Sequence, residues 1–392
     1  MRSVAILKLE THERLFDICI LSGKQKVLFR VISILEQEKG GVLVENSADQ
    51  DGQTNATDCP DLSICMVAFN ARDITLACIK SLIQWTKGID YELFLVDNGS
   101  TDGTADSIRG EFPTVNLIVN NVNKGFPAAN NQALSISKGR YCILLNNDMI
   151  FEQDALTQMV EYLDRNQDVG VLGCRLRYPD RRVQLTAHGD IRWQDHLFHA
   201  LFLNRIFPKT RTFGHVDCTY LDLETDDLAV EVDWVAGAGL MVRRSYMQRV
   251  GLLDEKILFT GEDWEWCRRF FITGYRIVYY TGAQIIHYHG VSTIRYEGPE
   301  ANKVRERSVM YMTATTHYVF RKLHTTRFIK IIFFSLAYRL HWLSRGIVHG
   351  LLYLIRSKSR RHNIGTIRGF FKGAFMTYKG LSQRFLAQDN GE

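Results

Sequence analysis

Acidic and amide side chains follow two apolar, strand-like runs of the sequence, at the point where each run ends. Asp97 ends the run YELFLVD and is followed by Asn98, and Asn146-Asn147-Asp148 follow YCILL. A carboxylate beside amides can hold Mg²⁺ or Mn²⁺ through oxygen, because these cations accept few protein ligands and complete their shell with phosphate oxygens. Asp97 could instead accept hydrogen bonds from a base or ribose. Asp, Asn, Gly and Ser are also common turn residues, so a purely structural loop is the alternative at both places.

Two further segments carry groups that could transfer protons or bind a metal. Glu262 and Asp263 directly precede the amphipathic stretch WEWCRRFFI, where they could supply a catalytic base or simply complement the helix dipole. His287 and His289 leave the apolar run AQII on the same face, since alternate residues of a strand point the same way. A histidine at the end of a strand is a candidate metal ligand, and its alternative is a half-buried structural histidine.

The segments that must position these groups alternate between strand and helix. Strands are expected at 62–69, 91–97, 115–120 and 141–147, and helices at 72–86, 103–110, 127–138 and 152–165. Near-continuous apolar strands alternating with helices predict an α/β fold with a parallel sheet covered on both faces. Ligands of such sheets bind at the carboxyl ends of the strands. Because Asn70, Asp97 and Asn146 stand at those ends, the pattern predicts one site there.

Composition excludes the non-globular classes and divides the chain by charge. The 392 residues are 46% hydrophobic and 23% charged, with a formal net charge of +5, which rules out disordered, collagen-like and low-complexity proteins. Residues 307–392 hold 15 Lys and Arg against two acids, a net +13, so residues 1–306 carry −8. An acidic body with a basic tail predicts that the tail meets an anionic surface. No nucleic-acid-binding module is recognisable, so a membrane is favoured over nucleic acid.

The first 60 residues lie outside the α/β pattern. They contain one expected helix at 24–37 and a polar linker at 46–60, and we interpret them as an accessory or oligomerisation segment, which makes a homo-oligomer an option. The apolar run 4–7 is too short for a signal peptide, and the eight Cys are scattered without a CxxC pair. These features predict a cytoplasmic protein with reduced, buried thiols.

The segment 327–356 reads as an apolar helix with one basic stripe. Its longest uncharged stretch, 331–338, is too short to cross a bilayer, which needs ~20 residues. At 100° per residue, five basic side chains fall within about a 100° arc. They are Lys330, His341, Arg345, His349 and Arg356. Such a helix suits a membrane interface, and the alternative is a core-packed helix with a solvated stripe. The sequence therefore predicts peripheral attachment to the inner face of the cell membrane.

The order and spacing of these segments resemble the family 2 glycosyltransferases of GT-A fold, particularly bacterial rhamnosyl- and galactofuranosyltransferases. The matching segments are VAFN (67–70), VDNGSTDGT (96–104), NKGFPAANNQAL (123–134), LLNNDM (144–149), VDWVAGAGLMVRR (232–244), VGLLDEKILFTGEDWEWCRR (250–269) and IIHYHG (285–290). The resemblance implies an α/β fold with a Rossmann-like nucleotide-binding sheet. The chain would then comprise an N-terminal extension and linker (1–60), a glycosyltransferase domain (61–300) and a basic, helical, membrane-associating region (301–392).

The resemblance also implies which residues bind the nucleotide-sugar donor. The nucleobase pocket would be lined by Val67, Ala68, Phe69 and Asn70. Asp97, next to Asn98, would pair with the base. Gly125, Phe126 and Asn130 would lie along the nucleotide and the donor sugar.

A divalent cation, Mn²⁺ or Mg²⁺, is implied in the same way. The triplet Asn146, Asn147 and Asp148 matches the family's DxD position, with Asp148 binding the cation that bridges the donor diphosphate. His287 matches a second metal ligand and is preferred to His289. Because Asn146 replaces the first aspartate of the motif, the expectation of metal dependence is weaker than a full DxD would make it.

The resemblance implies an inverting transfer. Asp263 matches the general base, Glu262 would orient the acceptor or support its loop, and the acceptor side would be formed by Trp234, Gly237 and Ala238. The expected donor is dTDP-rhamnose, with a UDP-sugar as the second choice, and the expected acceptor is a lipid-linked or cell-surface glycan. Two alternatives belong to other classes. A sugar nucleotidyltransferase would need a Gly-rich phosphate loop, which VAFNARD does not provide, whereas Asn146 gives slight support to a non-catalytic nucleotide- or glycan-binding subunit.

Overall fold

The computed structural model describes residues 4–11, 14–21, 28–31, 59–257, 260–288, 298–323, 328–355 and 360–375. The chain divides into two compact units, Met1–Ala56 and Thr57–Glu392. In the first unit, β1 (Val4–Thr11), β2 (Arg14–Leu21) and β3 (Leu28–Val31) form an antiparallel three-stranded sheet. The helix predicted at 24–37 is therefore wrong where β3 lies, because Leu28–Val31 pairs with Phe16–Cys19 of β2.

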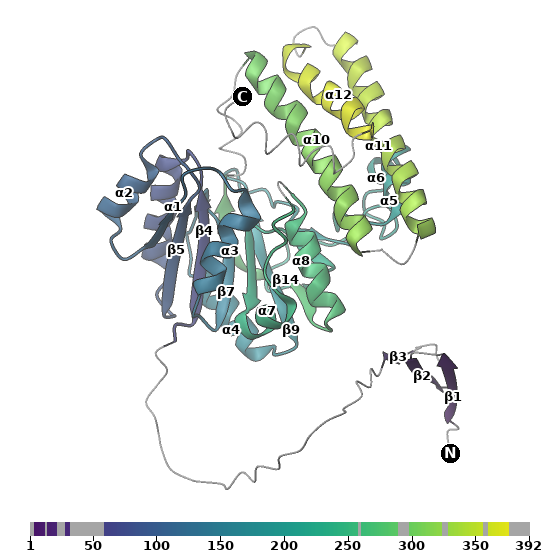
Figure 1. Ribbon diagram of the computed structural model, residues 1–392, viewed down its shortest axis with the longest axis horizontal. Coiled ribbons are helices and arrows are strands. Elements are labelled where there is room, and N and C mark those ends of the chain that lie inside the picture. Colours follow the sequence, from purple (N-terminus) through teal and green to yellow (C-terminus); the bar gives the residue numbers. More distant parts are fainter. Residues whose placement is uncertain are drawn as a thin grey trace. The chain divides into compact units, whose positions relative to one another are not determined.

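The second unit is built on a large sheet whose first half alternates strands with helices (Figure 1). These strands are β4 (Leu62–Ala68), β5 (Tyr91–Asp97), β6 (Asn116–Val119) and β7 (Tyr141–Asn146). The helices are α1 (Arg72–Trp85), α2 (Thr104–Glu111), α3 (Phe126–Ile136) and α4 (Ala155–Arg165). All four strands run parallel, and each predicted element is found within about three residues of its expected bounds.

The second half of the sheet is mixed rather than purely parallel. Its strands are β8 (Met149–Ile150), β9 (Val169–Arg177), β11 (Ala229–Glu231), β13 (Gly239–Arg243) and β14 (Arg276–His287). The strand β13 lies antiparallel between β7 and β9, whereas β14 runs parallel to β9. A separate two-stranded ladder joins β10 (Ala187–His188) to β12 (Trp234–Val235). The predicted α/β class is confirmed, with antiparallel strands added to the expected parallel set.

Both faces of the sheet are buried, which explains the near-continuous apolar strands. Along β4, Ile64 and Met66 pack with α1, α2 and α4, whereas Cys65 packs on the opposite face with α3, α7 (Arg244–Val250) and α8 (Glu262–Ile272). The parallel register aligns the ends of the strands, pairing Ala68 with Asp97 and Val67 with Asn146. The polar residues that follow these strands therefore gather at one edge.

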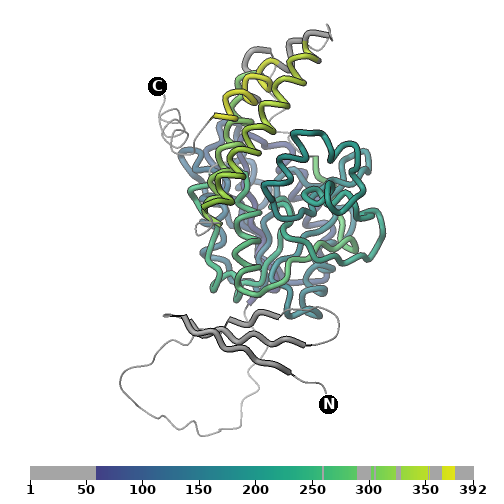
Figure 2. The backbone as a smooth tube through the Cα atoms, turned by 90° about the vertical axis from the view of Figure 1, so that its right-hand side faces the viewer, coloured from purple at the N-terminus to yellow at the C-terminus, as the bar shows by residue number. Residues whose placement is uncertain are grey.

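A group of helices packs beside the sheet, and side chains from most of them form a third apolar cluster. It comprises α5 (Trp193–Ala200), α6 (Leu203–Ile206), α10 (Gly298–Leu323), α11 (Phe328–Ile355) and α12 (Arg360–Phe375). Figure 2 shows α10, α11 and α12 side by side. Phe320 of α10, Phe334 of α11 and Phe370 of α12 share this cluster with Trp264 of α8. Among the described residues, no helix is long and apolar enough to cross a membrane.

The helix α11 turns its predicted basic stripe inward over part of its length. His341 is only 5% exposed and packs edge-on against the rings of His196 and Trp342. Arg345 is half-buried. Lys330 of the stripe is exposed, but around His341 and Arg345 the stripe faces inward, because the aromatic and imidazole rings of α5 and α11 fill the interface there. The outward side is apolar instead, with Phe328, Ile329, Ile332, Phe333, Leu336, Leu340, Ile347 and Leu351 exposed. Arg356 lies outside the described residues.

Candidate active site

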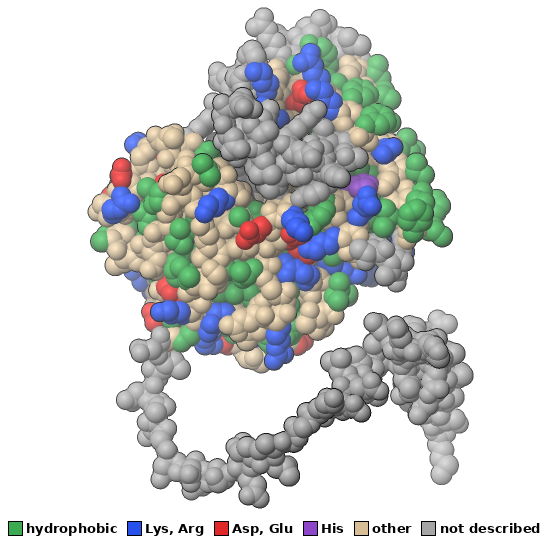
Figure 3. Space-filling model, in the orientation of Figure 1, with side chains coloured by type: hydrophobic (Ala, Val, Ile, Leu, Met, Phe, Trp, Pro, Cys, Tyr) green, Lys and Arg blue, Asp and Glu red, His purple; other side chains and the backbone are tan. Residues whose placement is uncertain are grey.

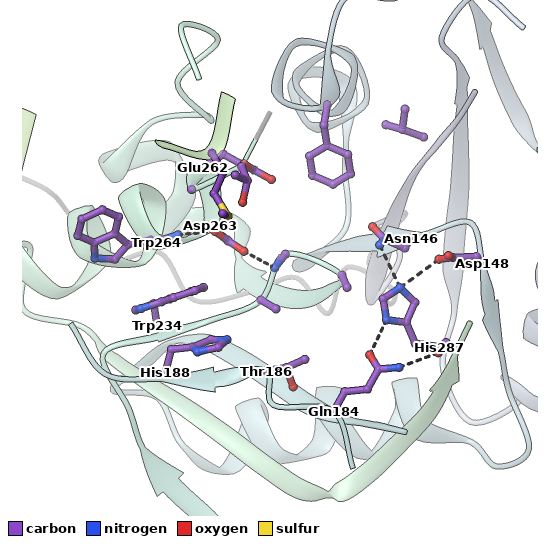
Figure 4. A pocket seen from close by; sticks show the side chains of 18 of the residues that line it. Asn146, Asp148, Gln184, Thr186, His188, Trp234, Glu262, Asp263, Trp264 and His287 are labelled. Atoms are coloured by element: carbon purple, nitrogen blue, oxygen red, sulfur yellow. Dashed lines mark hydrogen bonds and ion pairs between the residues drawn. The ribbon is translucent and has the colours of Figure 1, made fainter. Parts of the chain in front are cut away.

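A cavity of about 1100 Å³ opens where the carboxyl ends of the central strands meet the loops before α8 and β10 (Figure 4). It contains most of the residues that the sequence singled out. The predicted residues that line it are Val67, Phe69, Asn98, Gly125, Phe126, Asn146, Asn147, Asp148, Trp234, Gly237, Ala238, Glu262, Asp263 and His287. Residues far apart in the chain are thus brought together in one place. His289 lies outside the described residues.

Four predicted residues do not line the cavity. Ala68 is buried against the core, and Asp97 is 1% exposed, with its Oδ1 accepting a hydrogen bond from the Ser100 N–H at 2.9 Å. The side-chain oxygen of Asn70 accepts from the Thr101 N–H, and the Asn130 amide donates to the carbonyl of Phe126. These side chains hold the turns and the helix that carry the lining residues. Contact of these four with a bound nucleotide stays a prediction.

Asp148 and His287 meet because β8 and β14 are paired. The register places His287 opposite Met149, and the Tyr288 N–H donates to the Asp148 carbonyl at 2.9 Å. The imidazole Nε2 of His287 then lies 3.1 Å from Asp148 Oδ1 and 3.3 Å from the Asn146 amide nitrogen. Three polar groups from two strand ends converge on one point of the cavity wall.

This convergence suits a divalent cation that takes part of its shell from another molecule. Asp148 offers a buried carboxylate oxygen, and His287 offers a ring nitrogen beside it. Within the described part of the chain, no group of three or more His, Cys, Asp or Glu side chains could enclose a metal ion by itself. The residues present therefore fit an open cation site, in which phosphate oxygens or water would complete the coordination.

Asp263 and Glu262 enter the cavity from the first turn of α8. Gly261 precedes them with φ of 100°, a left-handed conformation that favours glycine, and this sharp turn directs both carboxyls inward. Asp263 Oδ2 accepts a hydrogen bond from the Gly237 N–H at 3.0 Å, and Oδ1 accepts from the Trp264 N–H at 2.8 Å. The carboxylate is thus fixed in orientation by backbone donors.

The two carboxyls share one buried environment but differ in how well it supports their charge. Burial raises the pKa of Asp263 above its ordinary value, and the N–H groups of Gly237 and Trp264 and nearby His188 oppose the rise. Burial, followed by the Asp263 charge, raises the pKa of Glu262 well above its ordinary value. Asp263 has two fixed N–H donors, whereas Glu262 Oε2 has no hydrogen-bond partner among the described residues, so the site supports a negative charge on Asp263 better than on Glu262.

Several residues that line the cavity were not predicted from the sequence. Gln184 hydrogen-bonds both the ring and the carbonyl of His287, and Asn123 accepts from the Asn98 amide at 2.8 Å. His188 stacks on Trp234 with ring centroids 3.9 Å apart. Asn123 lies inside the recognised segment 123–134, so its polar side chain could have been predicted to face the site. Gln184 comes from an irregular segment and His188 from the two-residue strand β10, and neither is long enough to show a periodicity.

The helical region also reaches the cavity. Met312 and Thr316, both on α10, line it together with Ile191 and Trp264. Trp234 is held in place by its stacking on His188 and by a hydrogen bond from its ring N–H to the Gly189 carbonyl at 3.0 Å. An aromatic face next to Asp263 is a surface on which a sugar ring can pack.

Comparison with known proteins shows which family part of the chain matches. The family model "Glycosyl transferase family 2" matches residues 63–221. O-antigen biosynthesis protein RfbC of Myxococcus xanthus is 27% identical over 224 residues, which are 56% of this chain and 16% of that protein. N-acetylglucosaminyl-diphospho-decaprenol L-rhamnosyltransferase of Mycobacterium tuberculosis is 27% identical over 182 residues, which are 44% of this chain and 58% of that protein.

A solved mannosyltransferase of Pyrobaculum calidifontis, in complex with GDP-Man and Mn²⁺, aligns with a TM-score of 0.49 at 13% identity, over 81% of this chain and 86% of that chain. The chain spans less than two thirds of the length of either of the two sequence relatives. Over residues 63–221 the family expected from the motifs is confirmed, and this part of the chain is a family 2 glycosyltransferase domain.

Proposed function

We propose that the protein is an inverting, metal-dependent glycosyltransferase that moves a sugar from a nucleotide sugar to an acceptor hydroxyl. One observation carries this proposal. A single cavity has a carboxylate fixed by backbone N–H groups, Asp263, on one side and the Asp148–His287 pair on the other (Figure 4). An inverting transfer needs both features, a base for the acceptor and a place for the donor diphosphate.

The donor would lie between the central strands and the loop before α3. Val67 and Phe69 line this part of the cavity and would contact the nucleobase. Asn98 accepts from the Lys124 N–H at 3.0 Å, and Asn123 Oδ1 accepts from the Gly125 N–H at 2.9 Å, so the loop leading into α3 is held against the end of β5. Gly125 and Phe126 follow at the start of α3, where backbone N–H groups favour an anionic ligand.

The chain's own residues carry the proton chemistry. Asp263 accepts the proton of the acceptor hydroxyl while that oxygen bonds to the anomeric carbon from the side opposite the diphosphate. The bond from the anomeric carbon to the diphosphate oxygen breaks at the same time, so the nucleoside diphosphate departs with the electron pair. A divalent cation held by Asp148 and His287 would stabilise the charge that develops on the diphosphate. A single ionised carboxylate therefore suffices, and the anomeric configuration inverts.

The acceptor would occupy the end of the cavity near Trp234, Gly237 and Ala238. Gly237 leaves room beside Asp263, since a Cβ at this position would come 3.5 Å from Asp263 Cβ. The pKa of Glu262 is raised by burial, and in its protonated form this side chain can donate a hydrogen bond to the acceptor. Met312 of α10 also lines the cavity, so the C-terminal helices would contribute to acceptor choice.

The first-choice donor is dTDP-rhamnose and the second is a UDP-sugar. The rhamnose choice is supported by the Mycobacterium tuberculosis relative, whose name specifies L-rhamnose and a diphospho-decaprenol acceptor. By analogy, the acceptor proposed for this chain is a lipid-linked or cell-surface glycan. Incubating the protein with Mn²⁺ or Mg²⁺, an acceptor glycolipid and a panel of nucleotide sugars, and measuring release of nucleoside diphosphate, tests the proposal. Donor binding without release for any pair would favour a non-catalytic nucleotide-binding subunit, which Asn146 in place of an aspartate slightly supports.

We also propose that the protein is peripheral on the inner face of the cell membrane, with the outward side of α11 as the contact surface. On the helical wheel the eight exposed apolar residues of α11 span an arc of roughly 140°, opposite the buried Phe334 and Tyr338. The helix contains no acid, and Lys330 and Arg339 are exposed on it. In Figure 3, apolar side chains gather at the edge where Figure 1 draws α11. An apolar surface with only positive charges suits an anionic lipid interface.

This surface connects with the acceptor end of the cavity through apolar side chains. Phe333 of α11 packs on Trp193, with ring centroids 5.3 Å apart. Trp193 and Ile191 both pack against the cluster that contains Trp264, and Ile191 and Trp264 line the cavity. A lipid-linked acceptor held in the bilayer would therefore reach Asp263 along a continuous row of apolar side chains that runs from α11 to the cavity.

A further inference from the structure

We propose that Gln184 is a positioning residue that fixes the tautomer of His287, so that Nε2 is the nitrogen presented to the cation. This inference rests on the proposed cation site and assigns a role to a residue that belongs to none of the recognised motifs. Gln184 is 3% exposed and belongs to the irregular segment between β9 and β10. Its own N–H donates to the Leu176 carbonyl at 2.8 Å, which anchors it beside the end of β14.

The two hydrogen bonds of the Gln184 side chain determine its orientation. The His287 carbonyl can only accept, so the group that faces it at 2.7 Å must be the Gln184 NH₂. The carbonyl oxygen of the same amide, Oε1, must then face the ring nitrogen Nδ1 at 2.8 Å. Because that oxygen can only accept, Nδ1 carries a hydrogen. In the neutral ring the lone pair is consequently on Nε2.

The tautomer decides what the Asp148–His287 pair can do. With the hydrogen on Nδ1, the lone pair of Nε2 and the carboxylate oxygen of Asp148 lie 3.1 Å apart and converge as two electron-rich donors suited to a cation. With the hydrogen on Nε2, the ring would donate it to Asp148 and close the pair as an ordinary hydrogen bond. Gln184 therefore favours the open, cation-binding arrangement over the closed one.

Three variants separate this role from simple packing. Gln184→Leu removes both hydrogen bonds at similar size, whereas Gln184→Glu keeps the acceptor for the Nδ1 hydrogen and loses only the donor to the His287 carbonyl. The matched control is Gln284→Leu on β14, whose side chain accepts from Arg177 and is not among the cavity-lining residues. The dissociation constant of Mn²⁺ alone, measured from the electron paramagnetic resonance of free Mn²⁺, should rise roughly 10–100-fold in Gln184→Leu. It should stay within about threefold of wild type in Gln184→Glu and Gln284→Leu.

A second measurement reads the tautomer directly and does not depend on activity. In ¹⁵N-histidine-labelled wild-type protein without metal, with His287→Ala used to assign the signal, the His287 Nδ1 should resonate as a protonated ring nitrogen. An unprotonated Nδ1 in the neutral ring would overturn the proposal, even if Gln184→Leu does not fold. Unchanged Mn²⁺ affinity in Gln184→Leu, beside a loss in His287→Ala, would overturn it and leave the cation site intact. Failure of wild type to bind Mn²⁺ would contradict the cation site itself.

Discussion

His287 Nε2 lies 3.1 Å from Asp148 Oδ1, and backbone pairing rather than side-chain packing sets this distance. The short strand β8 begins directly after Asp148 and pairs with the last residues of β14, with Met149 opposite His287. A carboxylate from the first half of the sheet and an imidazole from the last strand are thereby held at one point. Strand pairing therefore fixes the backbone of the proposed cation site. Substitutions of Asp148 or His287 should change cation affinity without rearranging the fold.

Restoring an aspartate at position 146 should strengthen cation binding. Asn146 Nδ2 lies 3.3 Å from His287 Nε2, so Asn146→Asp places a second carboxylate next to Asp148 and the ring. We expect the dissociation constant of Mn²⁺ to fall by about tenfold, because ligand charge raises the affinity for a hard cation. Calorimetric titration with Mn²⁺ measures this. Asn147→Asp is the control, since its side chain bonds to Thr75 instead, and an equal gain there would show a non-specific effect of charge.

The buried carboxyl of Glu262 should destabilise the protein as the pH rises. Its pKa in the folded protein is well above the ordinary value, so the folded state binds more protons and loses stability above the unfolded pKa of about 4.3. Glu262→Gln removes this loss. The variant should melt roughly 1–3 °C above wild type at pH 7, and the gap should close as the pH approaches 4. Calorimetric melts from pH 4 to 8 check this.

The exposed Glu161→Gln is the matched control for that experiment, since its carboxyl makes only a loose contact with Arg165. It should show no pH-dependent gain. If the difference in melting temperature between Glu262→Gln and wild type stays constant with pH, then changed contacts, and not the buried charge, determine the stability of the variant.

The outward side of α11 should determine binding to lipid vesicles. Leu336 and Ile347 are 60% and 56% exposed, and Leu336→Glu or Ile347→Glu replaces apolar surface with a charge of the same sign as the lipid. Each should weaken binding to vesicles of phosphatidylcholine and phosphatidylglycerol by about tenfold or more. The control is Ile272→Glu on α8, a residue that is equally exposed but lies outside α11. Vesicle sedimentation measures the difference.

Two results would contradict the membrane contact. Equal vesicle binding by wild type and both α11 variants would show that this side does not touch lipid. Absence of vesicle binding together with a self-association that Leu336→Glu abolishes would show that a second copy of the chain covers the helix instead.

Residues inside recognisable motifs could be predicted from the sequence, whereas residues of types common in turns could not be assigned securely. Asp148, Asp263 and His287 stand in motifs whose order was recognisable, and all three line one cavity. Asp97 looked like a ligand residue from its place at the end of β5. Its buried carboxyl accepts from a turn N–H, and Asp, Asn, Gly and Ser serve turns and ligands alike.

Other features depend on packing between distant elements, which one sequence does not encode locally. The 3.6-residue period correctly placed a basic stripe on one side of α11, but His341 faces inward because α5 supplies the ring of His196. Met312 reaches the cavity only because α10 packs against α8. Gln184 stands in an irregular segment, and its role depends on a strand end reached a hundred residues later.

The most direct test compares turnover and donor affinity in Asp263→Asn, with Asp106→Asn, an exposed residue on α2, as the control. Asn keeps an oxygen for the Gly237 N–H but cannot accept the acceptor proton, so nucleoside diphosphate release should fall by about 10²–10⁴-fold. The dissociation constant of the donor should stay within about threefold of wild type. Full turnover in Asp263→Asn, or a loss of donor affinity that accounts for the fall in rate, would contradict the assignment of Asp263 as the base.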